Sequence, residues 1–437
     1  MTCQPAHHNH HRAPLTLSTR RGMFQVSLST VLGTMMGPTL SSAFAGEAGR
    51  HYDAGKSVIL LWLEGGPFQT DTFDPKKSSD DKLGYRYRPV STSSPDLEIA
   101  ESLPLLAGQG NELAVIRSMV SVEFDHSPAQ YYMHTGWRGT GALQAPAIGS
   151  IVSHELGAQR GADLPAFVSI GRSGFPSGYF GPAHQPTVVW DPEQPPENLG
   201  LPAGVSAESF ARRLQYLKAL EAGDPTRTFA DRFRAGRQEA VRFMRSKHRS
   251  AFDISRESEQ VRDGFGRTQF GDSCLLARRL VESGVRFVQV RHTGEESANY
   301  DTHENHYALH DPLIRQLDRG MSQLIVDLKL RGMLESTVVI AAGEFGRTPT
   351  INGNQGRDHW TKGFSIAIAG GGFRGGCSYG SMNATGQEID SNPVSVPDFL
   401  ATLCHAIGID HDKEYVDDFN RPIKLVDEGR VITEILG

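Results

Sequence analysis

The sequence predicts an α/β protein with a central, mostly parallel sheet and helices on both of its faces. Short, continuous apolar runs such as 57–63 (SVILLWL) have the composition of strands that are buried on both faces. Amphipathic helical patterns lie between these runs, and strands that alternate with helices indicate crossover connections within a largely parallel sheet.

The same two patterns place the elements along the chain. Further strands are expected at 113–119, 166–170, 285–290, 337–342 and 364–369. Helices are expected at 207–221, 230–247, 272–283, 311–331 and 397–407. The Gly/Pro-rich stretch 171–204 and the charged helical stretch 206–260 interrupt this alternation. We therefore expect one α/β domain over 46–437 with an insertion or cap around 171–260.

Composition and charge exclude several classes of protein. Of the 437 residues, 38% are hydrophobic and 22% are charged, which excludes a largely disordered chain and a bundle of membrane helices. The formal net charge of −6 argues against nucleic acid as a partner, because nucleic-acid binding needs a basic surface. Four cysteines are too few for a disulfide scaffold, whereas seventeen histidines are a first hint of metal or acid–base chemistry.

A pair of arginines near the N-terminus predicts export. Arg20 and Arg21 precede a mildly apolar stretch, 24–40, and Ala43-Phe44-Ala45 has the small-residue pattern of a cleavage site. We predict that residues 1–45 are a twin-arginine signal peptide and that the mature protein is periplasmic or extracellular. A chance arginine pair in a disordered leader is the alternative. No transmembrane segment is expected in the mature chain, because no other apolar run approaches roughly 18 residues.

Carboxylates and imidazoles stand next to most of the predicted strands, at the ends where ligands bind in open parallel sheets. They are Glu64 and Asp71 after the first strand, Asp125 and His126 with Ser127 after the second, His292, Asp301, His303 and His306 after 285–290, Glu344 after 337–342, and Asp358 and His359 before 364–369. Each alone is explained as a cap or a loop stabiliser. As a set, mixed nitrogen and oxygen ligands favour Zn or Mn over Ca, which prefers oxygen alone.

The histidines at 303, 306 and 310 need separate treatment. Their spacing of three and four residues is ligand spacing on a helix. Asp311-Pro312 however predicts that the helix begins only there, so we expect His310 to be exposed and favour His303 as a ligand. His306 fits either interpretation, and Asp301 has an Asx-turn role as its alternative.

Several motifs resemble the alkaline phosphatase superfamily. Residues 337–346 (TVVIAAGEFG) are similar to the strand-then-carboxylate motif of its sulfatases, and 356–360 (GRDHW) to the late metal-binding histidine of its phosphopentomutase branch. His126-Ser127-Pro128 and Thr135-Gly136 have the spacing of the sulfatase nucleophile motif. The strongest resemblance is to an uncharacterised, twin-arginine-exported, sulfatase-like family with a domain of unknown function; it is carried by Gly65-Gly66-Pro67, 71–76 (DTFDPK), 301–303 (DTH) and 344–349 (EFGRTP).

This resemblance implies an alkaline phosphatase/sulfatase-like fold and an exported, metal-dependent hydrolase of phosphate or sulfate esters. It implies Glu344 and His359 as metal ligands, Asp301 and His303 as a second set, and Asp71 as the early carboxylate. Arg347 would then hold an anionic oxygen of the substrate. The expected partner is an anionic ester, with polysaccharide as one candidate.

The sequence also departs from the sulfatase pattern. His126 stands at the position of the nucleophile, which excludes formylglycine chemistry, and Gln130 replaces the arginine that follows it in sulfatases. The open choices are His126 as nucleophile or general base, Ser127 as nucleophile, or no covalent step. A non-catalytic periplasmic binding protein with a degenerate sulfatase-like fold is the alternative function.

Overall fold

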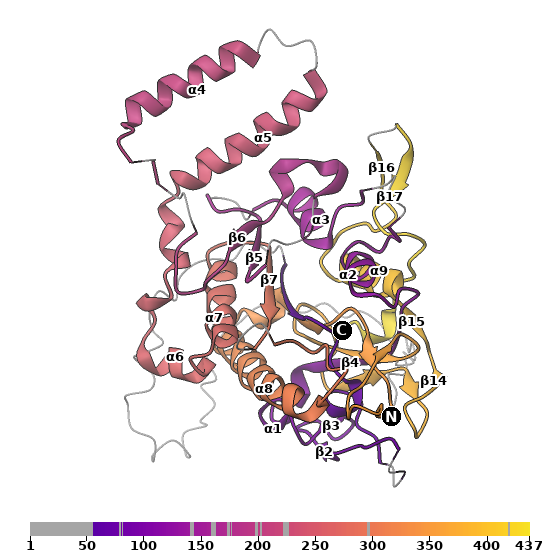
Figure 1. The fold of residues 1–437 in the computed structure, drawn as a ribbon. Coiled ribbons are helices and arrows are strands. Elements are labelled where there is room, and N and C mark those ends of the chain that lie inside the picture. Colours follow the sequence, from indigo (N-terminus) through magenta and orange to yellow (C-terminus); the bar gives the residue numbers. More distant parts are fainter. Residues whose placement is uncertain are drawn as a thin grey trace, which may run out of the picture. The chain divides into compact units, whose positions relative to one another are not determined.

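A computed structural model shows the arrangement of the chain (Figure 1) and describes residues 56–437 apart from 78–79, 81, 140–143, 159–162, 173–174, 176, 197–199, 202, 222–226, 295–297 and 418–419. The predicted signal peptide, residues 1–45, lies outside the described residues. None of the described helices is long and apolar enough to cross a membrane.

A nine-stranded sheet forms the centre of the described chain. Its order is β12 (Cys377–Tyr379), β4 (Leu113–Val120), β11 (Phe364–Ala369), β8 (Thr337–Ala342), β1 (Ser57–Leu63), β7 (Phe287–His292), β5 (Phe167–Ile170) and β6 (Thr187–Val189), and β15 (Val394–Ser395) pairs with β4. Only β11 runs antiparallel to its neighbours among these described strands. The predicted α/β class with a mostly parallel central sheet is confirmed.

Helices cover both faces of this sheet. Alternate residues of each central strand point to opposite sides, so a strand that is apolar throughout presents apolar side chains to both layers of helices. In β1, Ile59 and Leu61 belong to a core that includes residues of α7 (Gln269–Glu282) and α8 (His306–Leu330). Leu60 and Trp62 belong to a second core with residues of α2 (His126–Thr135), α3 (Ile148–Glu155) and α9 (Val396–Ala406). The continuous apolar run of β1 is therefore explained by burial on both faces.

The other elements are shorter or lie outside the sheet. They are α1 (Pro104–Ala107), α4 (Ala207–Glu221), α5 (Arg227–Met244) and α6 (Glu259–Phe265), and the paired short strands β2 (Pro89–Ser91) with β3 (Glu98–Ala100), β9 (Gly346–Arg347) with β10 (His359–Trp360), β13 (Ser381–Met382) with β14 (Ile389–Ser391), and β16 (Glu414–Val416) with β17 (Pro422–Lys424).

Within the predicted insertion around 171–260, one segment belongs to the sheet. The strand β6 pairs in parallel with β5. The helices α4 and α5 lie side by side (Figure 1), and Arg237 of α5 forms an ion pair of 2.7 Å with Glu221 of α4. No residue of α4 is buried.

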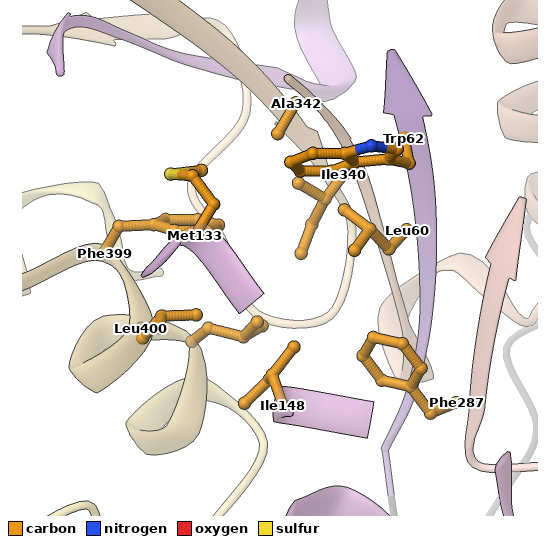
Figure 2. Close-up of a pocket in the computed structure, with 10 residues that line it drawn as sticks. Leu60, Trp62, Met133, Ile148, Phe287, Ile340, Ala342, Phe399 and Leu400 are labelled. Carbon is orange, nitrogen blue, oxygen red and sulfur yellow. The ribbon is translucent and has the colours of Figure 1, made fainter. Parts of the chain in front are cut away.

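Figure 2 shows a cavity inside the second core, between the sheet and helices α2 and α9. Its lining is made of apolar side chains such as Leu60, Ile340, Met133 and Phe399. Because these side chains carry no titratable or metal-binding group, this cavity offers packing but no chemistry.

Two local predictions are wrong. The helix α8 begins at His306 rather than Asp311, so that Pro312 lies inside it. Pro312 resembles a helix-start signal, but His306 and His310 are buried, and this burial favours an earlier start. The strand β7 extends to His292, which is buried and stacks on Phe270 at a centroid distance of 3.9 Å, so His292 is a core residue.

Candidate metal centre

Most of the predicted site residues come from segments next to strand ends at one edge of the sheet. The parallel strands β1, β7 and β8 end there, followed by Gly65, Asp301 and Glu344. Because β11 is antiparallel to β8, the segment that precedes β11 begins at this same edge. That segment contains His359 in β10, which pairs with Arg347 in β9.

Two glycines let these loops approach one another. Gly65 and Gly66 have φ angles of 98° and 80°, which side chains disfavour. A Cβ atom on Gly65 would lie 2.4 Å from the backbone nitrogen of Asp301, and one on Gly66 would lie 2.4 Å from the carbonyl oxygen of Phe345. The Gly65-Gly66 turn therefore fits between the loops that carry Asp301 and Glu344.

Three predicted ligands converge at this edge: Asp301, His303 and His359. His303 Nε2 lies 3.1 Å from His359 Nε2. Asp301 Oδ1 lies 3.1 Å from His303 Nε2 and 3.4 Å from His359 Nε2. Their side chains are 31%, 46% and 19% exposed, respectively, so the three atoms lie near solvent.

The hydrogen bonds of the Nδ1 atoms determine which nitrogen of His303 and of His359 carries the proton. His303 Nδ1 lies 2.7 Å from Asp358 Oδ1, and His359 Nδ1 lies 2.7 Å from the carbonyl oxygen of Phe124. A carboxylate and a carbonyl accept hydrogen bonds, so each Nδ1 carries a proton and donates it. In a neutral imidazole the Nε2 atom then holds a lone pair. Two imidazole lone pairs and one carboxylate oxygen therefore face a common point.

This donor set fits a metal ion. Tetrahedral zinc with bonds of about 2.0–2.1 Å places its ligand atoms about 3.3–3.4 Å apart, close to the three distances observed. Metal-bound histidines ordinarily donate the other ring N–H to a carboxylate or a carbonyl, as His303 and His359 do. Asp301, His303 and His359 would hold a divalent cation here, and their two nitrogens favour Zn or Mn over Ca.

His126, at the start of α2, lies between two carboxylates. Its Nδ1 atom lies 2.6 Å from Glu344 Oε1, and its Nε2 atom lies 3.2 Å from Asp301 Oδ2. His126, Asp301 and His359 also form a group whose ligand atoms all lie within 4.8 Å of one another. Burial lowers the pKa of His126, but the contacts with Asp301 and Glu344 outweigh burial and raise it to about 9.

Asp301 is ionised because cationic and imidazole groups surround it. Burial raises the pKa of Asp301, but contacts with His126, His359 and Arg347 outweigh burial and bring it far below its usual value. Asp301 Oδ1 accepts a hydrogen bond of 2.7 Å from Arg347 Nη2. The carboxylate is thus held in the charged form that a metal ligand needs.

Glu344 is linked to the three converging ligands through His126, which contacts both Glu344 and Asp301. Glu344 is fully buried and accepts hydrogen bonds from the backbone nitrogen of Gly65 at 3.1 Å and from Gln130 Nε2 at 3.2 Å. Its third partner is His126. Glu344 therefore orients His126, whereas the sequence analysis expected it among the ligands. Ser127 follows His126 in the first turn of α2 and is exposed.

Arg347 has a position that differs from the expected one. It is fully buried, and its guanidinium donates to the carbonyl oxygens of Gly66 and Arg357 and to Asp301, and also contacts the carbonyl oxygen of Gly65. Because these acceptors already occupy its donors, Arg347 holds the loops of the site together. The expected contact with an anionic substrate oxygen is not supported by this geometry.

Asp71 lies in a different cluster, with His306 and His310, and all three are fully buried. His306 Nε2 is 3.0 Å from Asp71 Oδ2, and His306 Nδ1 is 2.7 Å from Thr302 Oγ1. The structure thus separates Asp71 from the residues with which it was grouped. The expectation that His310 is exposed is wrong, because its ring packs edge-on against Tyr300 and accepts a hydrogen bond from the backbone nitrogen of Phe68.

The sequence points to Asp358 and Gln130 without indicating their roles here, and it does not point to the Phe124 carbonyl group or to Arg172. Asp358 and the carbonyl group of Phe124 orient the two histidines, and no motif marks a backbone acceptor. Gln130 and Arg172 also reach the site, and Arg172 follows the carboxyl end of β5. Arg172 could have been found by inspecting the residues that follow each predicted strand. The sequence does not single it out, because the loop after the short strand β5 has no carboxylate or histidine nearby.

Comparisons with known proteins place the chain in a family. It matches the family described as "Protein of unknown function (DUF1501)" over residues 55–436. No curated protein matched the chain in sequence.

Similar solved structures include a synthase, a sulfatase and a hydrolase. One is the lipoteichoic acid synthase LtaP from Listeria monocytogenes, with 11% identity, a TM-score of 0.37, and coverage of 86% of this chain and 75% of that chain. The PsFucS1 sulfatase from Pseudoalteromonas sp. has 12% identity, a TM-score of 0.39, and coverage of 88% and 72%. The phosphonate monoester hydrolase SpPMH from Silicibacter pomeroyi has 11% identity, a TM-score of 0.38, and coverage of 87% and 76%.

Identities and TM-scores at this level do not assign a reaction to this chain. The family match, in contrast, extends over nearly all of the chain beyond residue 54. This protein belongs to the DUF1501 family.

Proposed function

We propose that this protein is an exported, metal-dependent hydrolase of phosphate or sulfate esters that works without a formylglycine nucleophile. One observation carries the proposal: Asp301, His303 and His359 direct three acceptor atoms toward one point near solvent, and both histidines are oriented as ligands. A divalent cation held there supplies electrophilic polarisation of an ester oxygen and activation of water.

The residues around the ligands have roles that follow from their positions. His126 lies between Glu344 and Asp301, so it is placed to move a proton at the edge of the metal site. Glu344 is buried and fixes the His126 ring, as carboxylates do in acid–base pairs. Arg347 and the Gly65-Gly66 turn keep Asp301 in position.

The rim of the site suggests an organic ester. Val122 and Phe124, in the loop between β4 and α2, are 58% and 64% exposed. The carbonyl group of Phe124 accepts a hydrogen bond from His359, so the exposed ring of Phe124 lies on a segment that lines the site. Exposed apolar side chains beside a polar centre suit the organic part of an ester, including one face of a sugar ring.

The test is hydrolysis of aryl phosphates and aryl sulfates by the mature protein before and after metal loading. We expect metal-restored turnover that is lost in Asp301→Ala and His359→Ala, and kept in the surface control His405→Ala. His126→Ala should lose turnover but keep the metal; loss of the metal instead would make His126 a ligand.

The second candidate is a non-catalytic binding protein, which the histidine at the nucleophile position favours. It predicts metal retention without turnover on any ester of the panel. Absence of both metal and turnover would contradict the hydrolase and its metal centre together.

A further inference from the structure

The feature that carries this inference is a guanidinium group next to the candidate metal centre that lacks a strong partner. Arg172 lies two residues beyond the end of β5, at the same edge of the sheet. Its Nη1 atom is 3.5 Å from Glu64 Oε2, and its Nη2 atom is 3.5 Å from Gln130 Oε1. Both distances lie beyond the usual range of a charge-assisted hydrogen bond, which is about 2.7–2.9 Å.

Arg291 explains why Glu64 does not satisfy Arg172. Arg291 Nε and Nη2 lie 2.6 Å and 3.1 Å from the two oxygens of Glu64, in a bidentate pair. One carboxylate thus faces two guanidinium groups, and its better geometry is with Arg291. Among Glu64, Arg172 and Arg291, this leaves one positive charge in excess.

The excess charge is also poorly solvated. The side chain of Arg172 is 15% exposed, and its Nε and Nη1 atoms have no hydrogen-bond partner among the described residues. Its Cζ atom lies 4.8 Å from the ring centroid of Phe175, which covers the group without accepting a hydrogen bond. A buried guanidinium normally has an anionic partner, because an unpaired buried charge is costly.

Arg172 also reaches the residue that links it to the metal centre. Gln130 accepts from Arg172 through Oε1 and donates to Glu344 through Nε2 at 3.2 Å. In the sulfatase motif that this sequence resembles, the position of Gln130 holds an arginine. The structure brings a guanidinium to the side chain at that position from the loop that follows β5.

We propose that Arg172 binds the sulfate or phosphate group of the substrate, an assignment that rests on the hydrolase function proposed above. The other arginine at the centre, Arg347, is occupied by backbone carbonyls and Asp301. A sulfate or phosphate oxyanion that binds the Arg172 guanidinium through two hydrogen bonds replaces only two weak contacts. Little binding energy is lost in this exchange, and the excess positive charge gains an anionic partner.

The test measures binding of inorganic sulfate and, separately, inorganic phosphate to the mature protein by calorimetry, in metal-loaded and in chelator-treated samples. We expect Arg172→Gln to weaken anion binding by about 10-fold or more in both samples. Arg172→Lys should keep part of the affinity, and Arg138→Gln, at an exposed arginine near the end of α2, should change nothing. Melting temperatures identify any variant that fails to fold.

A second variant gives an effect of opposite sign. Glu64→Gln removes the carboxylate that competes for the guanidinium groups, so it should tighten anion binding by several-fold. The inference is overturned by an Arg172→Gln affinity within twofold of wild type, by unchanged or weaker binding in Glu64→Gln, or by no anion binding at millimolar concentrations. Arg172-dependent anion binding in a protein that retains no metal would leave the anion site standing and remove the hydrolase.

Discussion

Two clusters of carboxylate and imidazole side chains each take two members from the ten residues 301–310, yet they differ in chemistry. One contains Asp301 and His303 together with His359; the other contains His306 and His310 together with Asp71. In the first cluster, three acceptor atoms lie near solvent and 3.1–3.4 Å from one another. In the second cluster, all three side chains are fully buried.

Hydrogen bonding in the second cluster leaves the His310 ring without a lone pair on Nδ1, the nitrogen that faces Asp71 at 3.9 Å. His310 Nε2 accepts a hydrogen bond of 3.0 Å from the backbone nitrogen of Phe68, so the proton of the neutral ring is on Nδ1. Both ring nitrogens of His306 have partners, Thr302 and Asp71. Burial raises the pKa of Asp71 to about 7 and lowers that of His306 to about 2.

The comparison shows that residue type does not define a metal site. The same types of side chain make a candidate metal centre where the outer nitrogens donate to fixed acceptors. They make a structural network where the nitrogen of His310 that faces the carboxylate carries the proton. The second cluster lies behind the first, since Thr302 joins His306 to the loop of Asp301 and His303.

The largest expected effect is loss of the metal. Asp301→Ala and His359→Ala each remove one of three ligands, so affinity for zinc should fall by more than about 100-fold, beyond the effect typical of residues outside the ligand set. Elemental analysis after dialysis measures it, with His405→Ala as the surface control. Undiminished metal in both variants would remove the distinction between the clusters.

The next effect concerns stability and belongs to the buried cluster. His310→Ala leaves the backbone N–H of Phe68 unpaired and opens a void, so the free energy of unfolding should fall by about 3 kcal/mol. His303→Ala, at a side chain that is 46% exposed, should change it by less than about 1 kcal/mol. Urea unfolding of chelator-treated samples compares the two, and equal losses would contradict the assignment.

A smaller effect is expected outside the ligand set. Asp358→Ala removes the acceptor that orients His303, so metal affinity should fall by about 10–100-fold. Competition with a chromogenic chelator measures it. Asp263→Ala is the matched control, because the side chains of Asp358 and Asp263 are 54% and 65% exposed and Asp263 lies outside the metal-binding groups. An Asp358→Ala affinity equal to that of the control would argue against the fixed tautomer of His303.

The smallest effect is expected at the rim. Phe124→Ala should raise KM for an aryl ester by about 5-fold with little change in kcat, because the ring contacts the organic part rather than the reacting atoms. Leu330→Ala on α8 is the control, since Leu330 is 66% exposed and Phe124 is 64% exposed. A fall in kcat with unchanged KM would place Phe124 in the chemistry instead.

Much of the sheet could be predicted from the sequence, because its central strands are buried on both faces and read as continuous apolar runs. The ranges 57–63, 337–342 and 364–369 agree with β1, β8 and β11. The start of α8 could not be predicted. Pro312 has the sequence signature of a helix start, whereas the true start depends on the burial of His306 and His310, which is a tertiary effect.

The candidate site was only partly predictable, for a similar reason. Residues that follow strand ends could be collected on one edge, and Asp301, His303 and His359 do meet there. Which imidazole keeps a free lone pair depends on partners such as the Phe124 carbonyl and the Phe68 N–H, and backbone groups leave no mark in a sequence. The role of Arg347 depends on carbonyl oxygens in the same way.

The most direct measurement is anomalous diffraction at the zinc edge from crystals of the mature protein grown with zinc. We predict one strong peak within about 2.0–2.2 Å of Asp301 Oδ1, His303 Nε2 and His359 Nε2. A peak at Asp71, His306 and His310, or no peak at either cluster, would contradict the proposed metal centre.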